Sequence, residues 1–315
     1  MRITMRISVA AFTLNREFCK TRFYSIKIQY NEYSPILSRQ PTLSVYLFFG
    51  LILTALSLLL LFKQFQKHQR QRLFLKPLSP EWVKILKQNV SIYSLLPEPL
   101  KKELHGRINI FLNEKEFFAY GGLEISDEIQ LTVAGNACLL LLNRDKRCFP
   151  EFKSILMYPD TYVAKQVTSD GMVESHEHST RAGESWHRGP VVLSWADVMR
   201  GSLDPNDGHN VVLHEFAHKL DEANNSMNGL PVLRDHSHYA EWASVLSKEF
   251  DELVIRANRG KNSVIDAYGT VSPAEFFAVA TESFFEKPVQ MKTKLPELYE
   301  QLERFYGLDP ASWRS

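Results

Sequence analysis

One short motif constrains this chain more than any other feature, the sequence HEFAH from His214 to His218. On a helix, residues four apart lie one turn apart on the same face. Both imidazoles can then bind one metal ion while Glu215 lies beside it. The alternative, a core helix with two hydrogen-bonded histidines, buries polar side chains at a free-energy cost. Since a catalytic zinc ion takes three protein ligands and a water, the fold must bring a third ligand to this helix.

Several downstream side chains are candidates for the third ligand: Asp221, His236, His238, Glu241, Glu275 and Glu282. Glu275 and Glu282 are seven residues apart in one expected helix, so they lie on roughly the same face. The run SPAE that ends at Glu275 also matches a helix-capping box with proline at the first helical position. The spacing therefore leaves Glu275 open between cap and ligand. The pair His176 and His178 is interpreted as part of a solvated loop.

The strongest regional signal is the uncharged apolar run from Leu43 to Phe62. About 20 such residues are enough to cross the hydrocarbon core of a bilayer as a helix. Cations are concentrated after the run, at Lys63, Lys67, Arg70, Arg72 and Lys76. Because cytoplasmic flanks are enriched in Lys and Arg, this asymmetry predicts a single pass through the inner (cytoplasmic) membrane, with the C-terminal domain in the cytoplasm. These cations are also candidates for contact with anionic lipid headgroups.

The sequence divides into four predicted parts: an N-terminal extension over 1–42, a transmembrane helix over 43–62, a basic juxtamembrane linker over 63–79 and a domain over 80–315 that contains the predicted zinc site. The extension is rich in arginine and poor in acids, as in a targeting peptide. A start codon assigned too far upstream is the rival explanation, and the sequence leaves both open.

The composition of the chain mainly excludes other classes of protein. The chain has 315 residues, with 37 Lys and Arg against 36 Asp and Glu. A net charge near zero creates no general field for nucleic acid, so no direct nucleic-acid binding is expected. Cys19, Cys138 and Cys148 are too few and too scattered for a disulfide framework. No serine-hydrolase elbow, phosphate-binding loop or dinucleotide fingerprint is present in the sequence.

The order of expected elements predicts the fold class. Helices are expected from Pro80, and over Pro97–Asn113, Ser126–Leu142, 210–220, Tyr239–Ala257, Pro273–Phe285 and Pro296–Phe305. Strands are expected over Phe117–Tyr120, Ile155–Tyr158, Tyr162–Val167 and Val191–Trp195. Helices and a small sheet mixed without βαβ alternation indicate an α+β fold.

Three separated segments resemble one known family in the same order: GESWHRGPVVLSWADV, HEFAHKLD and IDAYGTVSPAEFFAVATESFF. Over residues 80–310 the chain is similar to the Mlc titration factor A family of zinc-dependent peptidases. The resemblance implies a zincin-like metallopeptidase domain with a gluzincin-type site. It implies Zn²⁺ on His214, His218 and Glu275, and it places Tyr268 near the metal. The best-known members lack the apolar run of residues 43–62.

These observations predict a membrane-anchored, zinc-dependent peptidase that acts on a peptide or protein substrate. Glu215 would be the general base and Tyr268 a donor to the developing oxyanion. Asp221 is open between orienting a ligand histidine and capping the helix. The strand over Val191–Trp195 is open between a substrate-pairing edge and an inner strand. The alternative function is a regulatory protein that binds and sequesters a partner, since the family's name reflects binding of a transcriptional repressor.

Overall fold

The computed structural model describes residues 43–144, 148–160 and 189–314. The chain divides into two compact units, Met1–Leu59 and Leu60–Ser315. The predicted extension over 1–42, the predicted strand over Tyr162–Val167 and the pair His176 and His178 lie outside the described residues.

Helix α1, Leu43–Leu75, contains the apolar run and continues through most of the basic segment. Its large apolar side chains are exposed, with Leu51 at 71% and Leu60 at 67%. The hydroxyls of Thr54 and Ser57 donate to carbonyl oxygens one turn earlier, so neither hydroxyl is left unpaired in the apolar run. The segment Tyr46–Leu75 is long and apolar enough to cross a membrane, by length and composition.

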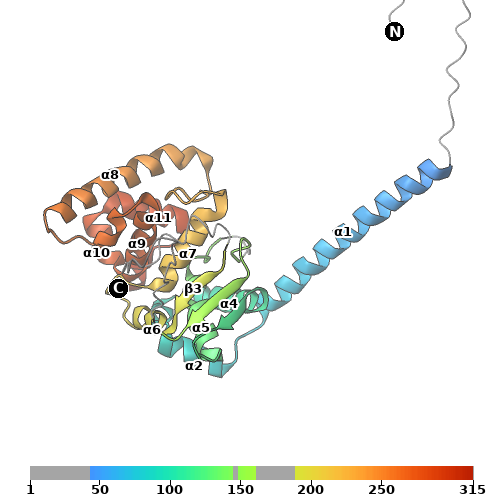
Figure 1. Ribbon diagram of the computed structural model, residues 1–315, viewed down its shortest axis with the longest axis horizontal. Coiled ribbons are helices and arrows are strands. Elements are labelled where there is room, and N and C mark those ends of the chain that lie inside the picture. Colours follow the sequence, from blue (N-terminus) through green and yellow to red (C-terminus); the bar gives the residue numbers. More distant parts are fainter. Residues whose placement is uncertain (1–42, 145–147, 161–188, 315) are drawn as a thin grey trace, which may run out of the picture. The chain divides into compact units, whose positions relative to one another are not determined.

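In its described residues, the second unit is mostly helical and contains a small three-stranded sheet (Figure 1). Its helices are α2 (Pro80–Asn89), α3 (Ser91–Leu95), α4 (Glu98–Glu114), α5 (Asp127–Leu139), α6 (Trp195–Leu203), α7 (Val211–Asp221), α8 (Tyr239–Asn258), α9 (Pro273–Glu286), α10 (Pro288–Lys294) and α11 (Pro296–Tyr306). Its strands are β1 (Glu116–Ala119), β2 (Ser154–Tyr158) and β3 (Val191–Ser194). Short 3-10 turns η2 (Glu222–Asn224), η3 (His236–His238), η4 (Ala267–Thr270) and η5 (Pro310–Arg314) complete the described elements.

The sheet is parallel, in the order β1-β2-β3. Strands β1 and β2 are neighbours joined through α5, which is a βαβ connection. The expectation that βαβ alternation is absent is therefore wrong at this point, whereas the expected small sheet among helices is present. The reason is that strands of four and five residues give little periodic signal, and parallel pairing across about 40 residues leaves no local pattern.

The two faces of the sheet differ in burial. Ile155, Met157 and Val191 are buried in the core, whereas Phe118, Leu156 and Val192 form a more exposed row across the three strands. Among the described residues, β3 is an edge strand and does not include Trp195, which begins α6.

Serine and asparagine caps fix where several helices begin. Ser79, Ser126, Ser194 and Ser272 each accept a hydrogen bond from a backbone N–H in the first turn of the following helix. The expected helices over Tyr239–Ala257, Pro273–Phe285 and Pro296–Phe305 are confirmed to within one residue at each end. The expected helix over Ser126–Leu142 ends earlier, at Leu139. Helices α7 and α9 pack against each other in the middle of this unit (Figure 1).

Candidate metal centre

Helix α7 is oriented by its apolar side chains. Phe216 is fully buried, and its ring lies 4.9 Å from that of Phe149 and 5.7 Å from those of Phe111 and Phe152. The side-chain oxygen of Asn210 accepts a hydrogen bond from the Leu213 N–H and caps the helix. With this side fixed in the core, the side of α7 that carries the two histidines lies against α9.

Helix α9 presents Glu275 in its first turn. The Glu275 N–H donates to the Ser272 hydroxyl at 3.2 Å, so the capping sequence does begin the helix. The Glu275 carboxylate lies against His214 and His218 of α7 and is only 5% exposed. The two interpretations of Glu275 therefore apply to different parts of the residue. Its backbone N–H takes part in the helix cap, while its carboxylate contacts the two histidines.

The three side chains converge on one point. The Nε2 atom of His214 lies 3.0 Å from Oε2 of Glu275 and 3.2 Å from Nε2 of His218. The third distance, from Nε2 of His218 to Oε2 of Glu275, is 3.4 Å. Two ligands held about 2.0–2.1 Å from a tetrahedral metal lie about 3.3 Å apart. The spacing and the two-nitrogen, one-oxygen donor set both fit a tetrahedral ion such as zinc.

Charges within the cluster are strongly coupled. Burial lowers the pKa of His214, but its hydrogen bonds to Glu275 and Glu282 outweigh burial and raise that pKa well above the usual value. Burial likewise raises the pKa of Glu275, but hydrogen bonds with His214 and His218 outweigh it and lower that pKa to about 2. The site thus stabilises positive charge beside a carboxylate, and a bound cation would replace the histidine protons.

Glu282, the other carboxylate on the same helix, contacts a different atom. Its Oε1 lies 2.8 Å from Nδ1 of His214, whereas Glu275 lies against Nε2 of that ring. Its Oε2 accepts the backbone N–H of Asn210 at 2.5 Å. Sequence reasoning considered Glu282 only as a rival ligand. The seven-residue spacing correctly placed both carboxylates on one face, but it carried no information about which ring nitrogen each one meets.

Glu215 and Tyr268 lie beside the cluster. Glu215 follows His214 in α7, is partly exposed, and is one of the charges that raise the pKa of His214. Tyr268 belongs to η4, where the Asp266 carboxylate accepts the Tyr268 N–H at 2.7 Å. The centre of the Tyr268 ring lies 6.0 Å from that of His214. Both residues named from the sequence therefore lie near His214, Glu215 as its neighbour in the chain and Tyr268 by the separation of the two rings.

The other ligand candidates lie outside the cluster. Asp221 is fully buried and accepts the Gly229 N–H at 2.7 Å, which ties the end of α7 to the following loop. His236 and His238 are exposed in η3. Glu241 pairs with Arg304 at 2.9 Å. Among the described residues, the metal-ligand grouping is His214, His218 and Glu275.

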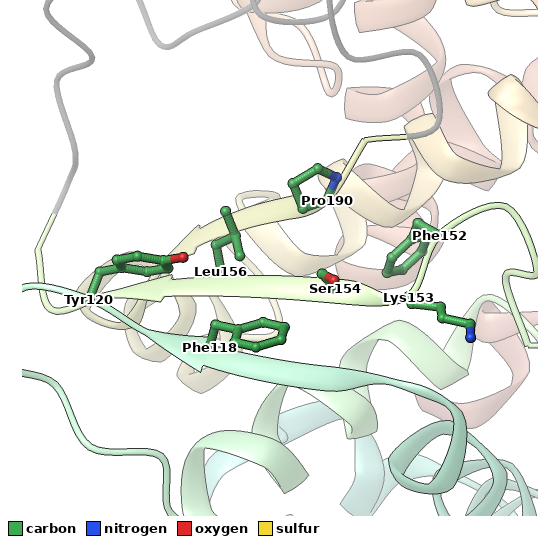
Figure 2. A pocket seen from close by; sticks show the side chains of 7 residues that line it. All are labelled: Phe118, Tyr120, Phe152, Lys153, Ser154, Leu156 and Pro190. Atoms are coloured by element: carbon green, nitrogen blue, oxygen red, sulfur yellow. The ribbon is translucent and has the colours of Figure 1, made fainter.

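A surface depression lies elsewhere, on the exposed face of the sheet. It has a volume of about 360 Å³. Figure 2 shows Phe118, Tyr120 and Leu156 lining it. None of its lining residues belongs to the metal grouping, so it does not define the candidate centre.

Known proteins are similar to most of the chain. A family model described as glucose-regulated metallo-peptidase M90 matches residues 65–307. An uncharacterized protein of Synechocystis is 38% identical over 244 residues, which are 77% of this chain and 89% of that protein. Mlc titration factor A of Yersinia pestis is 32% identical over 229 residues, which are 70% of this chain and 83% of that protein. Mlc titration factor A of Yersinia pseudotuberculosis matches with the same values.

Proposed function

The chain belongs to the glucose-regulated metallopeptidase M90 family, and on that premise we propose that it is a zinc-dependent peptidase anchored in a membrane. The observation that carries the proposal is the convergence of His214, His218 and Glu275 at tetrahedral ligand spacing. We assign these three side chains as the zinc ligands. The domain over residues 80–315 would then be zincin-like, with its two histidines on one helix and the glutamate on a later one.

The chemistry divides between the ion and the protein. Zinc, when bound, supplies a Lewis acid that polarises a peptide carbonyl and acidifies water. Glu215 would accept a proton from the attacking water and deliver it to the leaving amine. Tyr268 would donate its hydroxyl hydrogen bond to the oxygen on which negative charge develops. Both roles agree with the positions of these residues beside His214.

A peptide substrate also has a backbone partner close to α7. Strand β3 contacts that helix and is an edge strand among the described residues. An extended peptide could add to this edge through backbone hydrogen bonds, with alternate side chains on the two faces. We therefore propose that β3 aligns the substrate backbone, which favours the edge interpretation of this strand.

Membrane attachment would come from α1. Its apolar run needs an apolar environment, and the cations that follow the run favour the cytoplasmic side for the rest of the chain. We propose four parts: an extension over 1–42, a membrane span over 43–62, a basic juxtamembrane segment over 63–79 and the peptidase domain over 80–315. The catalytic domain would then act on cytoplasmic peptides or proteins.

The general base provides the direct test. In the full chain purified in detergent, Glu215→Gln should retain zinc and fold but hydrolyse a peptide panel about 10²–10⁴-fold more slowly. The amide is nearly isosteric with the carboxylate but does not accept the water's proton. Glu241→Gln is the matched control, because Glu241 lies outside the cluster and should be dispensable. Parental turnover in Glu215→Gln would exclude this mechanism.

A second candidate function is regulatory, and the name of the Yersinia relatives favours it. That name describes titration of Mlc, so we consider a role in which the domain binds a regulatory protein. Binding alone needs no general base. The Glu215→Gln chain should then retain complex formation with purified Mlc in size-exclusion chromatography even though it has no peptidase activity. Failure of parent and variant to bind would remove this candidate.

A further inference from the structure

His214 is held at both ring nitrogens by carboxylates from one helix. Glu275 meets Nε2 at 3.0 Å, and Glu282, two turns further along α9, meets Nδ1 at 2.8 Å. The zinc-binding role assigned to this histidine uses Nε2, the atom that faces Glu275 and His218. Glu282 is therefore on the opposite side of the ring and outside the ligand set. Its side chain is 6% exposed, so solvent does not compete strongly for these contacts.

Glu282 is itself fixed by the cap of the metal helix. Its second oxygen accepts the Asn210 backbone N–H, whose position follows from the path of the chain into α7. The NH₂ group of the Asn210 side chain lies 3.1 Å from each of three buried acceptors, on Asn136, the Gly201 carbonyl and Glu286, among which its two hydrogens are shared. One buried network thus links the start of α7, the middle of α9 and the His214 ring.

We propose that Glu282 is a positioning residue, which holds the proton of His214 on Nδ1 and keeps the Nε2 lone pair directed at the metal. The proposal rests on the zinc-peptidase function given above. A carboxylate accepts hydrogen bonds and does not donate them, so it selects the ring tautomer with hydrogen on the nitrogen that faces it. The same contact fixes the ring plane and increases the basicity of the coordinating nitrogen.

The two donors around Glu282 make a carboxylate necessary. The Asn210 N–H and the His214 Nδ1–H approach different oxygens of the same group. A glutamine has a single acceptor oxygen, and its NH₂ group would have to face one of these donors. The backbone N–H has no alternative tautomer, so the amide NH₂ would face the imidazole. His214 would then move its proton to Nε2, where it opposes metal binding.

The test compares zinc affinity between two isosteric changes on α9 of the full-length protein. Glu282→Gln should weaken zinc binding about 10–100-fold in competition with a chelator, the usual effect of losing such an outer partner. Glu286→Gln is the matched control. Glu286 lies one turn further on, is buried and contacts the same Asn210, but it contacts neither histidine. It should bind zinc as the parent does.

Spectroscopy separates positioning from general damage to the fold. In zinc-loaded protein with ¹⁵N-labelled histidine, the parent should show a hydrogen-bonded Nδ1 proton on His214. The ring keeps this proton while zinc occupies Nε2, but Glu282→Gln should lose its hydrogen bond, seen as loss of the downfield shift and of protection from exchange, while Glu286→Gln keeps both. If Glu282→Gln does not fold, Glu282→Asp replaces it. Asp retains the charge but is too short to meet both donors, so it should also weaken zinc binding, and by less than 100-fold.

Each result decides between definite alternatives. Zinc binding within twofold of the parent in either Glu282 variant, or a downfield and exchange-protected Nδ1 proton in Glu282→Gln, overturns the positioning role. Equal losses in the Glu282 and Glu286 variants overturn it as well, because they would report a damaged core. A parental protein that binds no zinc refutes the zinc-peptidase function itself, a failure recognised before any variant is measured.

Discussion

Helices α1 and α9 are both rich in apolar residues, yet their surroundings are opposite. The large apolar side chains of α1 from Tyr46 to Phe62 are exposed, whereas every residue of α9 from Ala274 to Glu286 is buried. The sequence difference is in the charges. The apolar run of α1 has none, and the buried part of α9 contains Glu275, Glu282 and Glu286. The long exposed run of α1 is consistent with the proposed membrane span, whereas the buried carboxylates of α9 coincide with the candidate metal centre.

The energetics support this distinction. Burying an ionised carboxylate is costly unless it is paired and hydrogen-bonded. Glu275 and Glu282 meet histidines of α7, whereas Glu286 has a neutral partner, Asn210, and burial raises its pKa so that it keeps its proton. In α1, each large apolar side chain left in water forgoes about 1.5–3 kcal/mol of burial free energy. A bilayer would remove that penalty. The apolar side chains of α9 are already buried in the protein.

The largest effect is expected at the carboxylate of α9 that faces both histidines. Glu275→Ala should abolish stoichiometric zinc in purified protein, measured by elemental analysis. Hydrolysis should fall by about 10³-fold or more, because a metal Lewis acid contributes several kcal/mol. Stoichiometric zinc in this variant would mean that α9 carries buried charge for structural reasons alone.

The second effect tests α1. Leu53→Arg combined with Leu56→Arg places two charges within the apolar run, where each disfavours insertion by about 2.5–3.5 kcal/mol. When membranes are sedimented without carbonate extraction, the variant should remain in the supernatant. Its zinc content and the melting temperature of the second unit should remain unchanged. Leu53→Ala with Leu56→Ala is the matched control and should remain in the membrane. Retention of the arginine variant would remove the lipid interpretation of α1.

Much of the candidate site was predictable because helical periodicity is local. The motif from His214 to His218 fixes two donors by sequence distance alone, and Glu275 with Glu282 share a face for the same reason. The choice between those two carboxylates depended on how α9 crosses α7, which is a matter of tertiary packing. The hydrogen bond from the Asn210 backbone N–H to Glu282 was not predictable from the sequence for the same reason, because the two residues are 72 positions apart.

The fold was less accessible than the site. The expected helices with clear caps and long periodic runs are present, as α8 and α9 show. Helices α3 and α10 are short, and no expectation covered them. The three strands were predicted from the sequence, but their parallel pairing was not. The partners of β2 lie far along the chain, at positions 116–119 and 191–194, and the pairing buries Ile155 and Met157.

A third prediction concerns the charge state of Glu286. Burial, together with the nearby charges of Glu282 and Asp207, raises the pKa of this carboxyl to about 9, although a hydrogen bond from Asn210 opposes the shift. A raised folded-state pKa means that the native protein holds a proton that the unfolded chain releases. The stabilisation is complete below the usual value of 4.5 and is lost as pH rises to about 9.

Glu286→Gln should remove this dependence, because the amide resembles the protonated acid and does not titrate. Over this pH range, the unfolding free energy of the parent relative to the variant should fall by about 1.4 kcal/mol per pH unit. Denaturant unfolding at several pH values measures the slope. Parallel stability curves for parent and variant would show that α9 buries this carboxyl in its charged form.

The smallest effect is expected at the residue that begins α9. The Ser272 hydroxyl accepts the Glu275 N–H, so Ser272→Ala removes a cap and should lower the unfolding free energy by about 0.5–2 kcal/mol. Zinc should remain stoichiometric, because the Glu275 carboxylate is held by the histidines of α7 rather than by the cap. Ser272→Asp is the conservative counterpart, since aspartate caps equally well, and it should restore most of the lost stability. Loss of zinc in both variants would show that the direction of the Glu275 carboxylate depends on the residue that begins α9. The buried charge of α9 would then depend on where the helix begins as well as on what it packs against.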